Sequence, residues 1–212
     1  MEYVKDLETP AVIVDLDIME KNLKHTAELA RNAGVKLRPH CKTHKSIWIA
    51  KKQLEYGAAG ITVAKLSEAE VMVNGGIDDI LVAYPIVGEK KLKRLEKLIK
   101  RASIIVCTDS VEVSQGLSDL GVSMGRKIKT YVQVNSGLQR CGREPGEETV
   151  ELVKSIIGLP GIEIIGLITH AGFSYDYVGE DSIRAAAHKE ADALLTTQKM
   201  LEKEGIEIKE IS

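Results

Sequence analysis

The stretch AVIVDLDIMEKNL, residues 11–23, passes from a β-branched strand pattern directly into a helical pattern without a single glycine. Downstream of it, strand-like and helix-like segments alternate, which is typical of parallel strands with helices packed outside and right-handed crossovers. Two architectures fit this order, an open doubly wound sheet and a closed barrel. Open nucleotide-binding sheets usually carry a glycine-rich loop after the first strand, and that loop is missing here. We therefore expect an α/β fold of the TIM-type (β/α)8 barrel class.

The distribution of polar side chains supports the barrel. The predicted strands cover residues 11–17, 35–42, 59–65, 78–84, 102–109, 129–135, 163–170 and 206–212, with amphipathic helices between them. Barrel enzymes place their working groups at the C-terminal ends of strands. The polar residues at or just beyond those ends are Lys42, Lys65, Tyr84, Asp109, Asn135, Arg140 and His170. Almost every predicted strand thus ends on a group able to do chemistry.

Composition excludes several classes of function. The chain has 212 residues, of which 44% are hydrophobic and 28% charged, with a formal net charge of -2. A near-neutral balance argues against nucleic acid as the main partner, and the basic run at 89–101 is interpreted as the solvated face of an amphipathic helix. No segment has the about 18 consecutive apolar residues of a membrane span. Cys41, Cys107 and Cys141 are widely spaced and odd in number, which favours reduced thiols in a cytoplasmic protein.

Residues 36–46, KLRPHCKTHKS, place cations where a core strand would be apolar. Because side chains alternate along a strand, Arg38, His40 and Lys42 share one face, which we expect to point into the barrel. Neighbouring cations disfavour each other's charged form, so a partly neutral lysine at the top can attack a carbonyl and form a Schiff base. Pyridoxal phosphate offers an aldehyde together with anionic groups that would offset the buried charge. A strand end that exposes its charges to water is the alternative.

A zinc site is an alternative for the same stretch, because His40, Cys41 and His44 are metal-binding residue types. His40 and Cys41 would lie on opposite faces of a strand, so they cannot easily share one ion. No second cluster with the spacing of metal ligands appears elsewhere in the sequence. We therefore predict no metal site within these residues.

The chain resembles fold-type III pyridoxal-phosphate enzymes, most closely the group of D-threonine aldolases and eukaryotic-type D-serine dehydratases. The resemblance follows the family's order across essentially the whole chain. Its segments are LETPAVIVDLDIMEKNL at 7–23, LRPHCKTHKS at 37–46, SEAE at 67–70, SGLQRCG at 136–142 and THAGFSY at 169–175. The run RPHCKTHK is highly specific, whereas TPAVIVDLD and SEAE are shared with alanine racemases and are weaker alone.

The resemblance implies that Lys42, and not Lys45, forms the Schiff base with pyridoxal phosphate. The strand argument agrees, since Lys42 closes the inward face and Lys45 falls beyond the strand end. Arg38 and His40 are expected beneath the cofactor, where their charges would orient and polarise Lys42.

Further cofactor contacts follow from the resemblance at three positions. Arg140 matches the arginine that approaches the phenolic oxygen, the alternative being a loop arginine paired with Glu144. His170 is expected beside the ring, the alternative being a core histidine with its hydrogen bonds satisfied. Tyr175, or else Tyr177, would meet the pyridine nitrogen, and a tyrosine that caps the surface is the alternative.

Two positions depart from the family pattern. Lys65 precedes SEAE where relatives usually have a small hydroxyl residue, so a second amine would look into the barrel mouth. Phe173 stands where D-serine dehydratases tend to have a histidine, which weakens that assignment.

Complete barrels have about 250 residues. By the resemblance, residues 206–212 form the seventh barrel strand, and the eighth strand, the phosphate-binding loop and a C-terminal β domain with the ligands of a divalent metal lie beyond the chain. We expect residues 1–212 to form one incomplete domain like the N-terminal barrel of alanine racemase, and we interpret the chain as a fragment rather than a natural truncation.

The resemblance implies a pyridoxal-phosphate-dependent lyase acting on D-configured 3-hydroxy amino acids. The leading expectation is a carbon-carbon lyase like D-threonine aldolase, which yields glycine and an aldehyde. A D-serine dehydratase, giving pyruvate and ammonia, is one alternative, and an amino-acid racemase or a non-catalytic pyridoxal-phosphate-binding protein is another. The expected partners are a small D-amino acid and, in the complete protein, a second copy in a homodimer.

Overall fold

The computed structural model describes residues 4–212, in which helices and strands alternate along the chain. The helices are α1 (Leu16–Asn32), α2 (Ile47–Glu55), α3 (Leu66–Asn74), α4 (Glu89–Ile99), α5 (Val111–Ser123), α6 (Glu147–Ile156) and α7 (Glu180–Lys203), with short 3-10 turns η1 (Val4–Asp6) and η2 (Gly172–Asp176). The strands are β1 (Ile61–Val63), β2 (Asp79–Pro85), β3 (Ser103–Thr108), β4 (Ile128–Gln133), β5 (Ile162–Ile168) and β6 (Glu210–Ile211).

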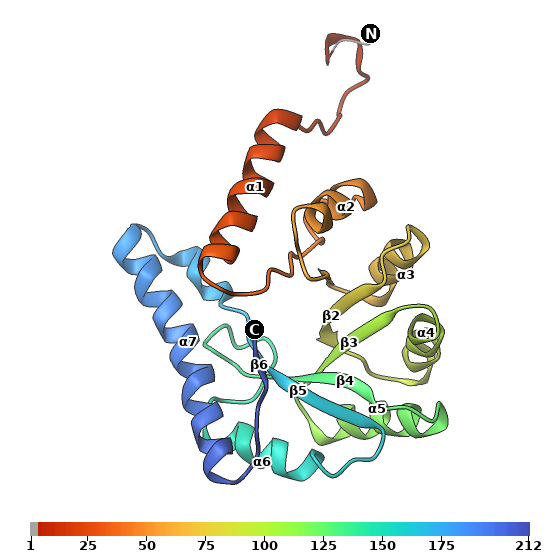
Figure 1. Ribbon diagram of the computed structural model, residues 1–212, viewed down its shortest axis with the longest axis vertical. Helices are drawn as coiled ribbons and strands as arrows, with labels where there is room; N and C mark the ends of the chain where they lie inside the picture. The colour runs from red at the N-terminus through yellow and green to blue at the C-terminus, as the bar shows by residue number, and fades with distance from the viewer. Residues whose placement is uncertain (1–3) are drawn as a thin grey trace.

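The strands form a single parallel sheet of six, in the order in which they occur along the chain. Figure 1 shows this sheet curling into a half-barrel, with helices α3 to α7 on its outer side. Parallel neighbours require crossover connections, and the helices supply them. The predicted TIM-type barrel, incomplete within this chain, is therefore confirmed.

Apolar side chains divide between the two faces of the sheet. The larger cluster fills the space between the sheet and the helices and includes Ile80, Val82 and Leu117. The smaller cluster lies on the opposite face, inside the barrel, and contains Leu81, Ile105, Cys107, Tyr131 and Ile168. Alternation along each strand thus decides which residues reach the lumen.

Two of the predicted strands, residues 11–17 and 35–42, do not form strands in the structure. Residues 11–15 pair with no strand in the described part of the chain, and α1 already begins at Leu16. Val12 is 98% exposed, so this β-branched run has neither a ladder nor a core to join. The predicted strand 35–42 forms only one isolated bridge, between His40 and Thr62, and the chain already enters a turn at Cys41. A strand exists only where a partner accepts its backbone hydrogen bonds.

Residues 37–41 nevertheless occupy the edge of the sheet beside β1. Leu37 O accepts from Ala59 N at 2.8 Å, Pro39 O accepts from Thr62 N at 2.8 Å, and Cys41 N donates to Thr62 O at 2.8 Å. Pro39 has no N–H to donate, which limits the regularity of the ladder. The segment therefore takes the place of a first barrel strand without the regular pairing of one.

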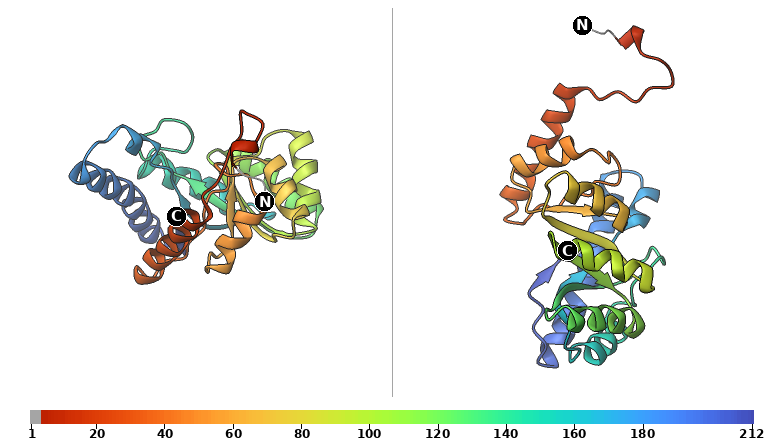
Figure 2. Two further views of the ribbon diagram at one scale, coloured as in Figure 1. Left: turned by 90° about the horizontal axis from the view of Figure 1, so that it is seen from above. Right: turned by 90° about the vertical axis from the view of Figure 1, so that its right-hand side faces the viewer.

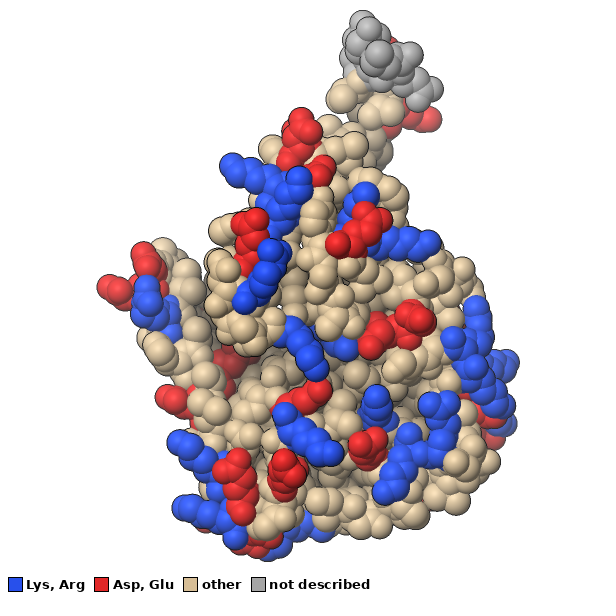
Figure 3. All heavy atoms as spheres, viewed as in Figure 1, with Lys and Arg blue, Asp and Glu red and all other residues tan. Residues whose placement is uncertain are grey.

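Helix α1 and the residues before it extend away from the half-barrel, as Figure 2 shows. Only Ala27 is buried within α1, whereas Leu16, Ile18 and Leu29 are exposed. Tyr56, directly after α2, donates a hydrogen bond of 2.6 Å to Glu20 of α1, and Lys24 Nζ lies 5.8 Å from the centroid of its ring. Among residues 4–212, no helix combines the length and the apolar character needed to cross a bilayer. On the face seen in Figure 3, cationic and anionic side chains are intermingled.

Candidate functional site

A tight turn carries Lys42 from the sheet edge into helix α2. Lys45 N donates to Cys41 O at 2.8 Å, and Lys42 N donates to His40 Nδ1 at 3.3 Å. The turn ends where Ser46 caps α2, its Oγ accepting from Ile49 N at 3.3 Å. We call residues 41–46 the lysine turn. It places the half-buried Lys42 at the C-terminal end of the edge segment, on the same end of the barrel as the ends of β4 and β5.

Four basic side chains at this end of the barrel influence one another electrostatically, namely His40, Lys42, Arg140 and His170, which we call the mouth cluster. Burial, and then the charge of Lys42, lowers the pKa of His40 from 6.5 to about 4. Burial, followed by the charges of Arg140 and Lys42, lowers the pKa of His170. Both histidines are therefore neutral at pH 7, so one ring nitrogen of each can accept a hydrogen bond, and in His40 this nitrogen is the Nδ1 that accepts from Lys42 N.

The loop after β4 presents Arg140 to the mouth cluster. Asn135 organises this loop, because its Oδ1 accepts from Gly137 N and from Gln139 N, each at 3.1 Å. Its Nδ2 donates to Glu144 Oε1 at 2.6 Å. The partner of Glu144 in this contact is thus Asn135, and within the described residues no ion pair joins Glu144 to Arg140. The exposed guanidinium stays available for an anion.

A small cavity beside the mouth cluster contains a polar group that the sequence analysis did not identify. It is lined in part by Gln133, Asn135, Arg140, Thr169 and His170. The Gln133 side chain is only 7% exposed, and its Oε1 has no hydrogen-bond partner among the described residues. A buried acceptor without a partner is costly unless something in the cavity donates to it. The sequence pattern that could have identified Gln133 is its position two residues before Asn135, on the same face of the predicted strand 129–135.

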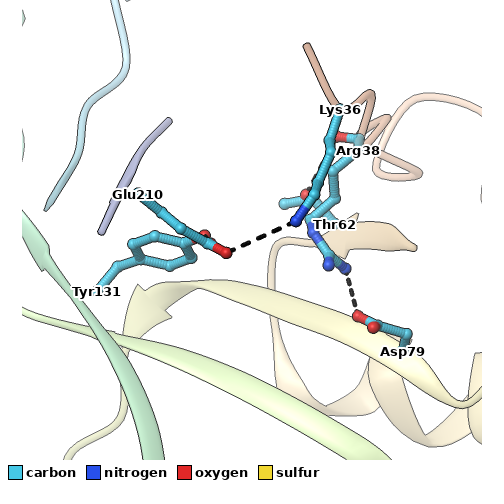
Figure 4. Close-up of polar contacts among 6 residues, drawn as sticks. All are labelled: Lys36, Arg38, Thr62, Asp79, Tyr131 and Glu210. Atoms are coloured by element: carbon cyan, nitrogen blue, oxygen red, sulfur yellow. Dashed lines mark hydrogen bonds and ion pairs between the residues drawn. The ribbon is translucent and has the colours of Figure 1, made fainter. Parts of the chain in front are cut away.

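Arg38 lies apart from the mouth cluster, near the N-terminal ends of the strands. Its Nη1 is 2.6 Å from Asp79 Oδ1, at the start of β2. Figure 4 shows this ion pair inside the barrel, together with Lys36 at 3.8 Å from Glu210. Tyr131 Oη also donates to Glu210, and burial raises the pKa of that phenol. We call this group the floor of the barrel.

The remaining expected residues are not part of the mouth cluster. Tyr175, in η2, is 80% exposed. The ring of Tyr177 packs edge-on against Phe173 at 6.1 Å between centroids. Lys65 lies two residues beyond Val63, whose side chain faces the helices. It lines a depression of about 320 Å³ together with Cys41 and residues of α3. Its amine therefore lies on the helix side of the sheet, not on the lumen side. No group of three or more potential metal ligands occurs within residues 4–212.

Comparisons with known proteins identify the family of this chain. The family described as "Alanine racemase, N-terminal domain" matches residues 14–212. A 3-hydroxy-D-aspartate aldolase of Paracoccus denitrificans is 33% identical over 169 residues, which are 79% of this chain and 44% of the relative. A D-threonine aldolase of Arthrobacter sp is 33% identical over 200 residues, which are 94% of this chain and 53% of the relative. This chain thus spans about half the length of the curated relatives it matches.

Solved structures give the same result. The crystal structure of D-threonine aldolase from Filomicrobium marinum superimposes with a TM-score of 0.93 at 36% identity, covering 98% of this chain and 56% of that one. A metal-free D-threo-3-hydroxyaspartate dehydratase mutant gives 0.90 at 30% identity, covering 99% and 55%. The resemblance noted in the sequence is confirmed: the chain belongs to the alanine racemase N-terminal domain family, within the D-threonine aldolase and D-serine dehydratase group of fold-type III pyridoxal-phosphate enzymes.

Proposed function

We propose that this chain contributes the cofactor-binding lysine to a pyridoxal-phosphate-dependent lyase that cleaves D-configured 3-hydroxy amino acids to glycine and an aldehyde. The observation that carries the proposal is the mouth cluster, in which Lys42 stands with two neutral histidines and a free arginine at one end of a parallel barrel. Barrel enzymes assemble their active sites at this end. Family members named D-threonine aldolase and 3-hydroxy-D-aspartate aldolase support the reaction class.

The residues of the cluster fit pyridoxal phosphate. Lys42 offers an amine for the aldehyde, and Arg140 offers a cation for the phenolic oxygen. His170 lines the small cavity beside the mouth cluster, and the unpaired Gln133 Oε1 provides an acceptor there. Tyr175 is the proposed partner of the ring nitrogen, and this role requires that its exposed phenol become buried on binding.

His40 and Arg38 act beneath these contacts in our proposal. His40 Nδ1 holds the backbone N–H of Lys42 at 3.3 Å and so helps to orient the lysine turn. Arg38 is tied to Asp79 at the floor of the barrel, so its influence on Lys42 passes through the edge segment that carries both residues.

Cleavage requires that the 3-hydroxyl lose its proton, that the Cα–Cβ bond break and that Cα gain a proton. Bound pyridoxal phosphate supplies the electron sink for the pair of electrons left on Cα. The neutral imidazole of His170 is able to accept a proton near pH 7. The divalent metal and the homodimer implied by the resemblance are part of the same proposal, as is a cytoplasmic location, which the free thiols of Cys41, Cys107 and Cys141 favour.

A dehydratase is the second candidate, because a D-threo-3-hydroxyaspartate dehydratase of Delftia is 30% identical over 203 residues, 94% of this chain. The same mouth cluster would then serve removal of the Cα proton, with loss of hydroxide from Cβ. Products distinguish the two reactions. D-threonine would give glycine and acetaldehyde in an aldolase, whereas D-serine would give pyruvate and ammonia in a dehydratase.

The site itself is tested by Lys42→Ala and Lys45→Ala in the protein expressed from its natural gene. Borohydride reduction followed by peptide mapping identifies the lysine that holds pyridoxal phosphate covalently. We expect Lys42→Ala to abolish the attachment, and Lys45→Ala to retain it at Lys42. Covalent attachment that survives Lys42→Ala and disappears only in Lys45→Ala would refute the assignment.

A further inference from the structure

A nearly buried carboxylate lies against the lysine turn without touching Lys42 itself. Glu68 belongs to the first turn of α3, and only 11% of its side chain is exposed. One oxygen, Oε2, accepts from Ala64 N at 2.8 Å, just beyond the end of β1. The other, Oε1, pairs with Lys45 Nζ, in the lysine turn. Glu68 therefore connects the end of a core strand to the segment that carries Lys42.

The backbone of the lysine turn needs such support. Lys45 has φ 50°, in the left-handed region that side-chain-bearing residues rarely adopt. A residue in that region persists only when surrounding contacts hold it there. The contacts that hold Lys45 are its backbone hydrogen bond to Cys41 O at 2.8 Å and its ion pair with Glu68. The ion pair is thus one of the contacts that hold the end of the turn, together with the Ser46 cap of α2.

The charge of Glu68 also reaches the mouth cluster. Burial alone would raise the pKa of Glu68, but hydrogen bonds from Lys45 and Ala64 N outweigh it and keep the carboxyl ionised. Burial and the charge of Lys42 lower the pKa of His40, and the carboxylate of Glu68 opposes them. The negative charge of Glu68 therefore acts on His40, the neighbour of Lys42 in the mouth cluster.

We propose that Glu68 is a positioning residue for Lys42. By tying Lys45 to the end of β1, it fixes the direction in which the lysine turn presents its amine to the barrel mouth. This inference rests on the proposed function, because it assigns a residue that prepares the same site. A surface salt bridge that only stabilised the fold would cost stability on removal but leave the reactivity of Lys42 unchanged.

Three variants isolate the contact. Glu68→Gln keeps the side-chain volume and an oxygen for Ala64 N but removes the charge that holds Lys45. Lys45→Met removes the other partner, and the double variant removes both. Glu70→Gln is the matched control, since Glu70 lies on the same helix and pairs through two contacts of 2.7 Å with Arg94, away from the lysine turn. Lys45→Arg restores a cation and should rescue the turn.

Hydrogen exchange in the ligand-free protein measures the turn directly. We expect the amides of residues 42–46 to exchange about tenfold faster in Glu68→Gln and Lys45→Met, with β2 and β3 unchanged. The rate of covalent pyridoxal phosphate uptake at Lys42 should fall by roughly 10- to 100-fold in the same variants, because the amine is no longer held in its reactive direction. The double variant should be no slower than either single variant, since both remove one contact.

The proposal is overturned if uptake at Lys42 is unchanged in Glu68→Gln, if the losses of the two single variants multiply, or if Glu70→Gln slows uptake equally. Should the unaltered protein take up no pyridoxal phosphate, the proposed function fails by itself. Hydrogen exchange then decides the structural part: faster exchange confined to residues 42–46 supports the tie made by Glu68, and unchanged exchange overturns it.

Discussion

Replacement of Arg38 by methionine tests whether the cation at the barrel floor acts through the fold or by touching the cofactor. The Arg38–Asp79 pair is 2.6 Å long, and its side chains are 20% and 42% exposed. The guanidinium crosses Gly60 so closely that a Cβ added there would lie 2.1 Å from Nη1. Methionine keeps the apolar stem of the side chain and leaves Asp79 without this partner.

The exposed fractions of Arg38 and Asp79 determine how much stability the loss of their ion pair should cost. Exposed ion pairs contribute up to about 1 kcal/mol, and loss of one partner of a buried pair costs about 3–5 kcal/mol. A partly buried pair lies between these limits, so we expect Arg38→Met to lower the free energy of unfolding by about 2 kcal/mol. With a urea slope of about 2 kcal/mol per molar, the unfolding midpoint should fall by about 1 M.

Urea unfolding of Arg38→Met, Asp79→Asn and the double variant gives the coupling between the two side chains, which we expect to be about 1 kcal/mol or more. Gly60→Ala is an independent perturbation, because the added methyl group displaces the guanidinium without removing a charge. The affinity for pyridoxal phosphate should stay within about threefold in Arg38→Met. A large loss of affinity with an unchanged unfolding midpoint would refute the reasoning and place Arg38 in contact with the cofactor.

Three further predictions concern the barrel mouth. The pKa of His40 is ordinarily 6.5 and falls to about 4 in the folded protein, so the unfolded chain takes up a proton at a higher pH than the folded one. Stability is therefore lost as the pH falls from about 6.5 to about 4, and the urea midpoint should be lower at pH 5 than at pH 7. His40→Asn should reduce this difference. Gln133→Leu removes a buried acceptor without a partner, so it should stabilise the ligand-free protein by up to about 1 kcal/mol. The same variant should bind pyridoxal phosphate more weakly, and a lower stability than that of the unaltered protein would contradict the prediction. Gly142 has φ +98°, and a Cβ there would lie 2.8 Å from Asn135 N. Gly142→Ala should therefore lower the free energy of unfolding by about 2 kcal/mol and lower the Tm, whereas an unaltered Tm would show that the loop tolerates a side chain.

The central strands were predictable because they are buried on both faces. The predicted segment 102–109 contains β3, in which Ile104 to Thr108 are all buried. Continuous apolar runs of this kind identify parallel strands without reference to their partners. The segment 11–17 has a similar composition but no partner among the described residues, so composition alone misassigned it. Strand formation is a property of a pair of segments, and the sequence pattern describes only one of them.

The barrel class could be predicted from the sequence, and so could three residues, Lys42, Arg140 and His170, that the structure brings to one end of the barrel. Arg140 and His170 follow strands, Lys42 follows the edge segment at 37–41, and parallel segments bring such ends together whatever the details of packing. The contacts of Arg38 with Asp79 and of Lys45 with Glu68 could be found only in the folded molecule. These contacts join residues far apart along the chain, and they depend on how sharply the sheet curls and how each helix docks on it. Local spacing carries no information about either, so the residues that hold the site in place emerged only from the fold.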